Sequence, residues 1–198
     1  SQSRNFRSSL FFNRGNSAYS LEYSYINTSS KVLLTNGFDS RNSLEHLFNT
    51  RVNISRVLTL NTRSIMGERL YVSEFFDDRS YGYSFYEIEP KLQFTYKNKY
   101  RLELNSKSFK ARNTEQYGGE TAINIELGTE FRYTEAGKGA FNAGFSFINV
   151  DFDGIASSTL GYELLRGLQN GNNSTWKIGY QRTLSNSVQV VVSYDGRK

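Results

Sequence analysis

Residues 122–133 read AINIELGTEFRY, the stretch of the chain that decides the fold. From Ile123 to Tyr133 the odd positions carry apolar side chains or a threonine, and the even positions from Asn124 to Arg132 carry polar side chains or glycine. Successive side chains of a β-strand point to opposite faces, so this alternation predicts a strand with one apolar and one polar face. The stretch is about twice as long as a common strand of ~5–6 residues.

The composition narrows the class of protein. The chain has 198 residues, enough for one sizeable domain, and 15% of them are aromatic, which is typical of a folded chain rather than a disordered one. Its net charge of +5 is dispersed without a block of like charges, so we expect no nucleic-acid partner. There is no cysteine for a disulfide framework or a thiolate zinc site. No apolar run is long enough for a transmembrane helix.

The alternation recurs along the whole chain, whereas the 3.6-residue period of a helix is rare. We predict about ten strands, near residues 4–13, 17–27, 44–54, 57–67, 84–96, 100–110, 120–133, 140–152, 174–182 and 187–195. One short helix is predicted within a loop, with Leu160, Leu164, Leu165 and Leu168 on its apolar face and Gly171 at its end.

The connections between these strands alternate in length. They are tight at 14–16, 55–56, 97–99, 134–139 and 183–186, and longer at 28–43, 68–83, 111–119 and 153–173. Tight turns at one end and long loops at the other are typical of the connectivity of a transmembrane β-barrel. Sandwiches do not keep this regular alternation of short and long connections. We therefore predict an all-β, antiparallel up-and-down meander over residues 1–198 that forms a transmembrane β-barrel or part of one.

The two faces of the strands have separate predicted roles. The apolar face is predicted to contact lipid through Leu92, Phe94, Tyr96, Leu102, Leu104, Ile123, Ile125, Leu127, Phe131, Tyr133, Trp176, Ile178, Tyr180, Val188, Val190, Val192 and Tyr194. The polar face is predicted to line the lumen with Glu89, Lys91, Arg101, Glu103, Glu126, Glu130, Arg132, Lys177 and Gln189. Charges of both signs favour pairing within a plugged lumen over a selective pore. Alternation alone is equally compatible with the core of a soluble barrel or sandwich.

Tyrosines end several of the apolar rows. Tyr25, Tyr96, Tyr133, Tyr180 and Tyr194 occupy these positions, which is typical of aromatic side chains at a membrane interface.

The order of the connections also indicates whether the sequence contains all the strands of a barrel. The first connection is tight. The sequence ends at YDGRK, where the alternation of short and long connections predicts a long loop. In bacterial barrels the N-terminus and the C-terminus usually both lie on the side of the tight turns. We therefore expect at least one further strand before Ser1 and one after Lys198, which gives a parent barrel of about twelve strands or more.

Three pieces of the chain carry a resemblance to a known group of proteins. They are YEIEPKLQFTY (86–96), INIELGTEFRYTEAGKGAFNAGFSFINVDFDG (123–154) and GYELLRGLQNGNNSTWKIGYQRTLSNSVQVVVSYDGRK (161–198). Together they resemble the C-terminal region of large, mostly uncharacterised outer-membrane or surface β-proteins of Bacteroidota. The resemblance implies a β-barrel in the bacterial outer membrane, with a further strand after the DGRK-like turn. It brings no catalytic residue.

Two groups of residues are candidates for chemistry. His46 lies near Ser43 and Glu45, as in a barrel hydrolase, but no oxyanion glycine motif accompanies them, and we interpret His46 as an ordinary polar residue. Asp151 and Asp153 are weak candidates for calcium ligands, because they share a face at the end of a strand. The alternative for this pair is a solvated strand end.

Basic residues near the loops are candidates for contacts with lipopolysaccharide phosphates. They are Arg41, Arg69, Arg79, Lys107, Lys110 and Arg112. We therefore expect a non-enzymatic outer-membrane anchor, scaffold or component of a transport, secretion or assembly complex, with no cofactor. Its expected partners are lipid, lipopolysaccharide and other subunits of such a complex. The alternative is a soluble, secreted β-rich binding module, for example one that binds carbohydrate.

Overall fold

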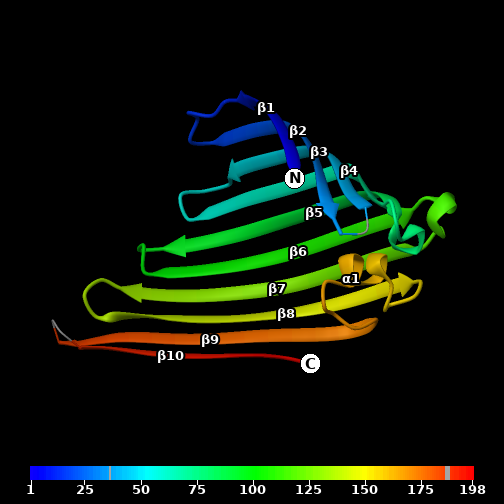
Figure 1. The fold of residues 1–198 in the computed structure, drawn as a ribbon. Coiled ribbons are helices and arrows are strands. Elements are labelled where there is room, and N and C mark those ends of the chain that lie inside the picture. Colours follow the sequence, from blue (N-terminus) through cyan, green and yellow to red (C-terminus); the bar gives the residue numbers. More distant parts are fainter. Residues whose placement is uncertain (36, 186–187) are drawn as a thin grey trace.

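The computed structural model describes residues 1–35, 37–185 and 188–198. They form one antiparallel sheet of ten strands, in which each strand pairs with its neighbours in sequence (Figure 1). The strands are β1 (Gln2–Phe12), β2 (Tyr19–Leu34), β3 (Gly37–Asn53), β4 (Leu58–Ser73), β5 (Tyr81–Tyr96), β6 (Tyr100–Asn113), β7 (Thr121–Glu135), β8 (Gly139–Asp153), β9 (Gly171–Ser185) and β10 (Val188–Arg197). Short helices lie in the loops: η1 (Asp77–Arg79), η2 (Glu115–Tyr117) and α1 (Thr159–Leu165).

The predicted antiparallel meander is confirmed, but several strands are longer than predicted. The loop predicted at 28–43 is wrong: β2 continues to Leu34 and β3 begins at Gly37, with paired backbone from Thr28 opposite Ser43 onwards. This hairpin has polar side chains on both faces near Ser29 and Ser40. Backbone pairing does not require an apolar face, so alternation marks only the part of a strand that has one.

The two ends of the sheet differ as predicted in their remaining connections. At one end, the turn end, the connections 13–18, 54–57, 97–99 and 136–138 are short. At the other, the loop end, the segments 74–80, 114–120 and 154–170 are longer. The turn predicted at 183–186 includes Asn186, which lies outside the described residues.

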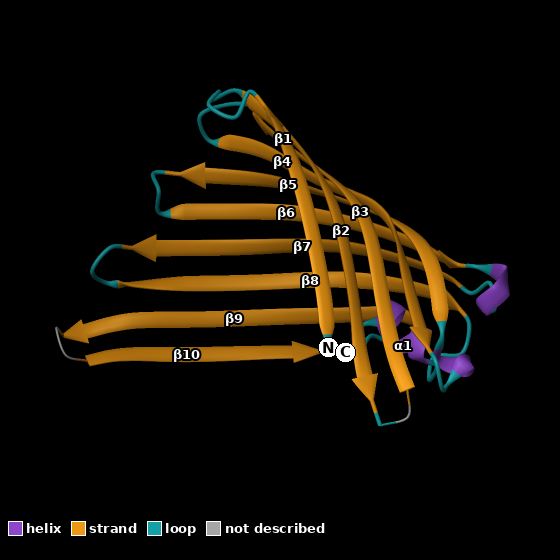
Figure 2. Cartoon of the chain, turned by 45° about the horizontal axis from the view of Figure 1, so that its top comes forward, coloured by secondary structure: helices purple, strands orange, loops and turns teal. Residues whose placement is uncertain are grey.

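The sheet is strongly twisted and open. Figure 2 shows β1 to β3 running steeply across the view and β7 to β10 running almost level. The strand order begins at β1 and ends at β10, and no pairing joins these two strands in the described residues. The structure therefore shows a curved meander, and closure into a barrel remains a prediction.

The register agrees with the sequence pattern. In the hairpin of β5 and β6, Tyr96 lies opposite Tyr100 and Phe94 opposite Leu102, because the odd length of the turn keeps the apolar positions of both strands on one face. Tyr133 of β7 likewise lies opposite Phe141 of β8. A slip of one residue would turn these side chains to the other face.

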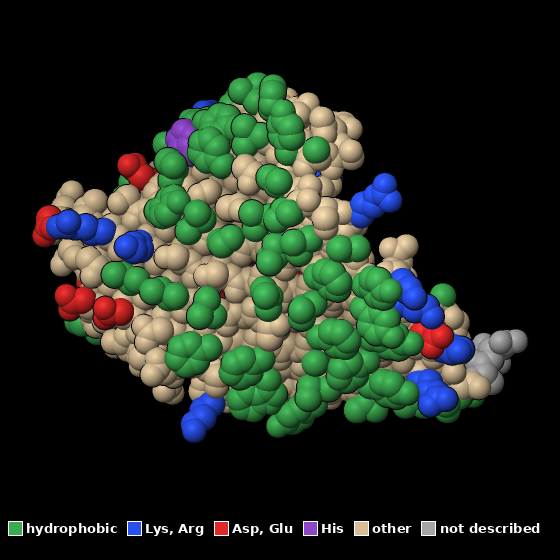
Figure 3. All heavy atoms as spheres, turned by 180° about the vertical axis from the view of Figure 1, so that it is seen from behind, with side chains coloured by type: hydrophobic (Ala, Val, Ile, Leu, Met, Phe, Trp, Pro, Cys, Tyr) green, Lys and Arg blue, Asp and Glu red, His purple; other side chains and the backbone are tan. Residues whose placement is uncertain are grey.

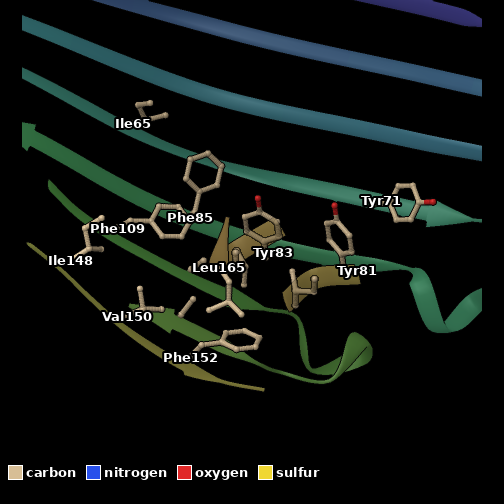
Figure 4. Packing of buried hydrophobic residues seen from close by; sticks show 14 of the residues in the cluster. Ile65, Tyr71, Tyr81, Tyr83, Phe85, Phe109, Ile148, Val150, Phe152 and Leu165 are labelled. Carbon is tan, nitrogen blue, oxygen red and sulfur yellow. The ribbon is translucent and has the colours of Figure 1, made fainter. Parts of the chain in front are cut away.

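A hydrophobic core lies on one face of the sheet near the loop end, under helix α1 (Figure 4). We call this face the inner face. Ser158 caps α1, because its Oγ accepts a hydrogen bond of 2.9 Å from the Gly161 amide. The helix buries Leu160, Leu164 and Leu165, which confirms the predicted helix, although it ends at Leu165, with Arg166 as its C-cap, and not at Gly171. Sheet residues complete the core: Leu47, Ile65, Tyr71, Tyr81, Tyr83, Phe85, Phe109, Ala111, Ala122, Ile148, Val150 and Phe152.

Candidate membrane-facing surface and inner face

The opposite face of the sheet, the outer face, carries a belt of exposed and half-buried apolar side chains. The register aligns them in rows across neighbouring strands; one row runs from Phe94 through Leu102, Phe131 and Ala143 to Ile178. Figure 3 shows apolar side chains spread over this face, with charged ones mainly at its margins. The residues predicted to face lipid lie here, except that Val188 lies where the register of β10 shifts against β9.

An aromatic row borders the belt at the turn end. Its members lie opposite one another on five successive strands: Tyr96, Tyr100, Tyr133, Phe141 and Tyr180. The rings of Tyr100 and Tyr133 have centroids 5.0 Å apart. The other two tyrosines predicted to end apolar rows lie outside this aromatic row: Tyr25 pairs with His46 in the middle of β2, and Tyr194 pairs with Ile178, one row further in. Aromatic borders of this kind are typical of membrane interfaces.

The turn-end border of the belt is level across the middle of the sheet and offset at its two edges. From β5 to β9 it follows the aromatic row without a shift in register. On β2 the belt begins at Tyr19, which the register aligns with Leu92 of β5, four residues before Tyr96. At the other edge the belt includes Val190, which pairs with Arg182 beyond Tyr180.

Charged residues border the belt at the loop end. Ile123 lies between Lys110 and Asp151, and Thr121 lies between Arg112 and Asp153. Of the basic residues predicted to meet lipopolysaccharide, only Lys110 and Arg112 lie on the outer face of a strand.

The other basic candidates are placed differently. Arg41, Arg69 and Lys107 point to the inner face, where Arg41 lies over the ring of Tyr71 and Lys107 pairs with Glu87. Arg79 belongs to η1 and lies 4.1 Å from the ring of Phe76. The prediction used the position of these residues along the chain and not their parity, which places the three strand residues on the face opposite to Lys110 and Arg112.

His46 and Ser43 lie on opposite faces of β3. The His46 ring lies in the outer belt, and its Nδ1 is 2.8 Å from the Tyr23 hydroxyl. The Ser43 hydroxyl is on the inner face and donates to Glu45 at 3.0 Å. The two side chains therefore cannot act on one reacting group.

Asp151 and Asp153 lie on the outer face of β8, and both are exposed. The neighbouring Asn149 side chain donates to Asn172 at 2.8 Å. Among the described residues, no group of three or more His, Asp or Glu side chains could hold a metal ion. Nothing in the geometry therefore supports a calcium site at this pair.

The inner face is polar towards the turn end. The residues predicted to line the lumen lie here, and many form ion pairs: Lys91 with Glu89 at 2.9 Å, Arg101 with Glu103 at 3.0 Å and Lys177 with Glu130 at 2.7 Å. The last pair spans two strand intervals, because Gly144 of β8 lies between its members. A Cβ at Gly144 would lie 2.7 Å from Lys177 Cε, so a larger residue there would displace the lysine side chain from its present path.

The inner face is apolar towards the loop end, a division that sequence reasoning missed. Tyr81 and Tyr83 lie in a segment that was predicted to be a loop, and Phe85 of β5 and Val150 and Phe152 of β8 have the parity of the predicted polar face. The stretch YGYSFYEI carries aromatic residues at both parities, and this signal indicates a strand that is apolar on both faces.

Arg69 connects the sheet to α1 beside this core. Its Nη2 lies 2.9 Å from Glu45 Oε1 of β3, and its Nη1 lies 3.0 Å from Glu163 Oε1 of α1. The Tyr83 hydroxyl of β5 also donates to Glu163 at 3.3 Å. These bonds hold the helix against three strands.

Glu135 lies just beyond the aromatic row, at the turn of β7 and β8. The Lys138 ammonium, 3.1 Å away, and the Tyr133 hydroxyl, also 3.1 Å away, donate hydrogen bonds to its carboxylate and hold its pKa below the ordinary value. We expect an NMR titration to give a low pKa for Glu135, and Lys138→Ala to raise it, since the largest stabilising contact is lost. The matched variant Lys97→Ala, in the neighbouring turn, should leave it unchanged. An equal pKa in wild type and Lys138→Ala would contradict this assignment.

No helix among the described residues is long and apolar enough to cross a membrane. Neither a protein-family model nor a curated protein sequence matches the chain.

Proposed function

We propose that this sheet is part of the wall of a β-barrel in the bacterial outer membrane, with a non-enzymatic role as anchor, scaffold or component of a transport, secretion or assembly complex. The observation that carries the proposal is the exposed apolar belt of the outer face, which runs from β1 to β10. Soluble monomers rarely expose continuous apolar patches of more than a few hundred Å². Lipid is the solvent in which such a belt is stable.

The borders of the belt support the same proposal. Aromatic side chains end it at one side and charged side chains at the other, which matches the two interfaces of a bilayer. In this arrangement the turn end faces the periplasm and the loop end faces outward. Lys110 and Arg112 then lie just beyond the belt, where lipopolysaccharide phosphates would meet them.

Closure of the sheet is part of the proposal. Both edge strands, β1 and β10, are largely exposed. In hydrocarbon each unpaired backbone group costs several kcal/mol, so open sheet edges do not occur there. The edges would pair with each other or with further strands of the kind expected before Ser1 and after Lys198.

The inner face favours an anchor or scaffold over an open channel. The loop-end half is filled by the aromatic core and by α1, and the turn-end half carries charges of both signs that pair with one another. A selective pore would be expected to show one sign of charge along an unobstructed path.

A soluble carbohydrate-binding module is less well supported. A ligand site combines apolar surface with convergent polar groups. Here the exposed outer face places Leu127 beside Phe147, while the charged groups of these strands' middle parts lie on the other side of the sheet.

Expression of residues 1–198 tests the proposal. We expect the chain to aggregate in aqueous buffer and to gain β-structure when diluted from urea into detergent micelles or phosphatidylcholine vesicles. Circular dichroism and co-flotation with the vesicles measure both steps. A chain that stays monodisperse in buffer and does not float with vesicles would overturn the proposal.

A further inference from the structure

A trough lies on the inner face between β1 and β5, near the turn end. Its volume is about 620 Å³, within the range of small-molecule sites, and its lining includes Arg14, Arg51, Arg63, Lys91, Glu22 and Glu89. Four cationic side chains therefore face two carboxylates. The lining has an excess of positive charge, unlike the balanced pairs elsewhere on this face.

Both carboxylates already have partners. Glu89 pairs with Lys91 at 2.9 Å, and Glu22 accepts hydrogen bonds from Asn49 at 3.2 Å and lies 3.5 Å from Arg7. Among the described residues, Arg51 and Arg63 form no ion pair with any carboxylate. Arg63 lies opposite Glu89 in the register, and the carboxylate of Glu89 is bonded to Lys91 instead.

Arg51 shows this most clearly. Its Nη2 donates to the backbone carbonyl of Asn16 at 3.0 Å, and its buried Nε has no acceptor. The register places Asn61 between Arg51 and Lys91 in a single row across β3, β4 and β5. This row contains donors and no carboxylate.

We propose that the trough binds a small organic anion through its carboxylate or phosphate groups, with Arg51 and Arg63 as the principal ligands and Asn61 as a further donor. The planar guanidinium group matches both oxyanions with two parallel hydrogen bonds, and such charge-assisted bonds are the strongest of their kind. The inference goes beyond the proposed membrane role and does not depend on it, because the trough lies on the face away from the belt.

Isothermal titration calorimetry of the refolded chain tests the site, with sodium phosphate and sodium citrate as probes and glucose as the neutral control. We expect saturable binding of at least one anion and none of glucose. The double variant Arg51→Gln/Arg63→Gln should weaken binding by about tenfold or more. The matched control Arg101→Gln removes a cation from the same face that is already paired with Glu103, and it should change affinity less than about twofold.

Circular dichroism of each variant verifies folding before titration. Absence of saturable binding to either anion, or equal loss in Arg101→Gln and in the double variant, would overturn the site. Binding of phosphate alone or of citrate alone identifies the group that is recognised. A chain that stays soluble in buffer and still binds the anion would refute the membrane proposal and support this one.

Discussion

Replacement of Leu127 by arginine is expected to destabilise the membrane-inserted protein by about 2–4 kcal/mol, the cost of a cation on the lipid face near the middle of a bilayer. Leu127 lies in the middle of the belt, on the outer face of β7, and its side chain is 57% exposed. The same change at an exposed site in water usually alters stability by less than about 0.5 kcal/mol. The substitution therefore separates lipid from water as the solvent of this face.

The matched control is Thr121→Arg, on the same face of the same strand but beside Arg112 and Asp153, outside the belt. Its expected cost is below about 1 kcal/mol, as for cations near the interface. Urea unfolding of both variants in phosphatidylcholine vesicles, followed by tryptophan fluorescence or circular dichroism, gives the comparison. Equal and small effects of the two substitutions would contradict lipid contact at Leu127.

Truncation of Leu164 to alanine is expected to cost about 2–5 kcal/mol, the usual range for a fully buried leucine. Leu164 is 1% exposed and belongs to the core that α1 forms with β5 and β8. The lost side chain would leave a cavity between the helix and the sheet. Unfolding of the detergent-refolded protein in urea measures the loss.

Tyr162→Ala is the control within the same helix, because Tyr162 is 70% exposed. It removes a larger side chain from α1 without opening the core, so we expect a change below about 1 kcal/mol. If both variants unfolded at the same urea concentration as the wild type, α1 would not be packed against the sheet in solution.

Period-two alternation was sufficient to predict the meander and its register. The hairpin of Tyr96 and Tyr100 has the predicted pairing because a three-residue turn keeps two apolar rows on one face. The helix at Leu160–Leu165 was also predictable, since its apolar spacing and its Ser158 cap are both local signals. Such signals depend on neighbours in sequence.

What could not be predicted depends on contacts between distant residues. The paired backbone between Thr28 and Ser43 has no continuous apolar face, so the sequence offers no sign that a strand continues there. The core of Tyr83, Val150 and Leu164 joins residues far apart in the chain. The positions of Arg69 and Lys107 were predictable in principle, because each has the parity of inner-face neighbours in its own strand.

The ion pair between Lys177 and Glu130 has a consequence for assembly. Glu130 is on β7 and Lys177 on β9, and the lysine lies across Gly144 of β8. Neither hairpin can form this bond alone. The bond therefore requires β7, β8 and β9 to lie in their native alignment, so its presence reports on the register of three strands at once.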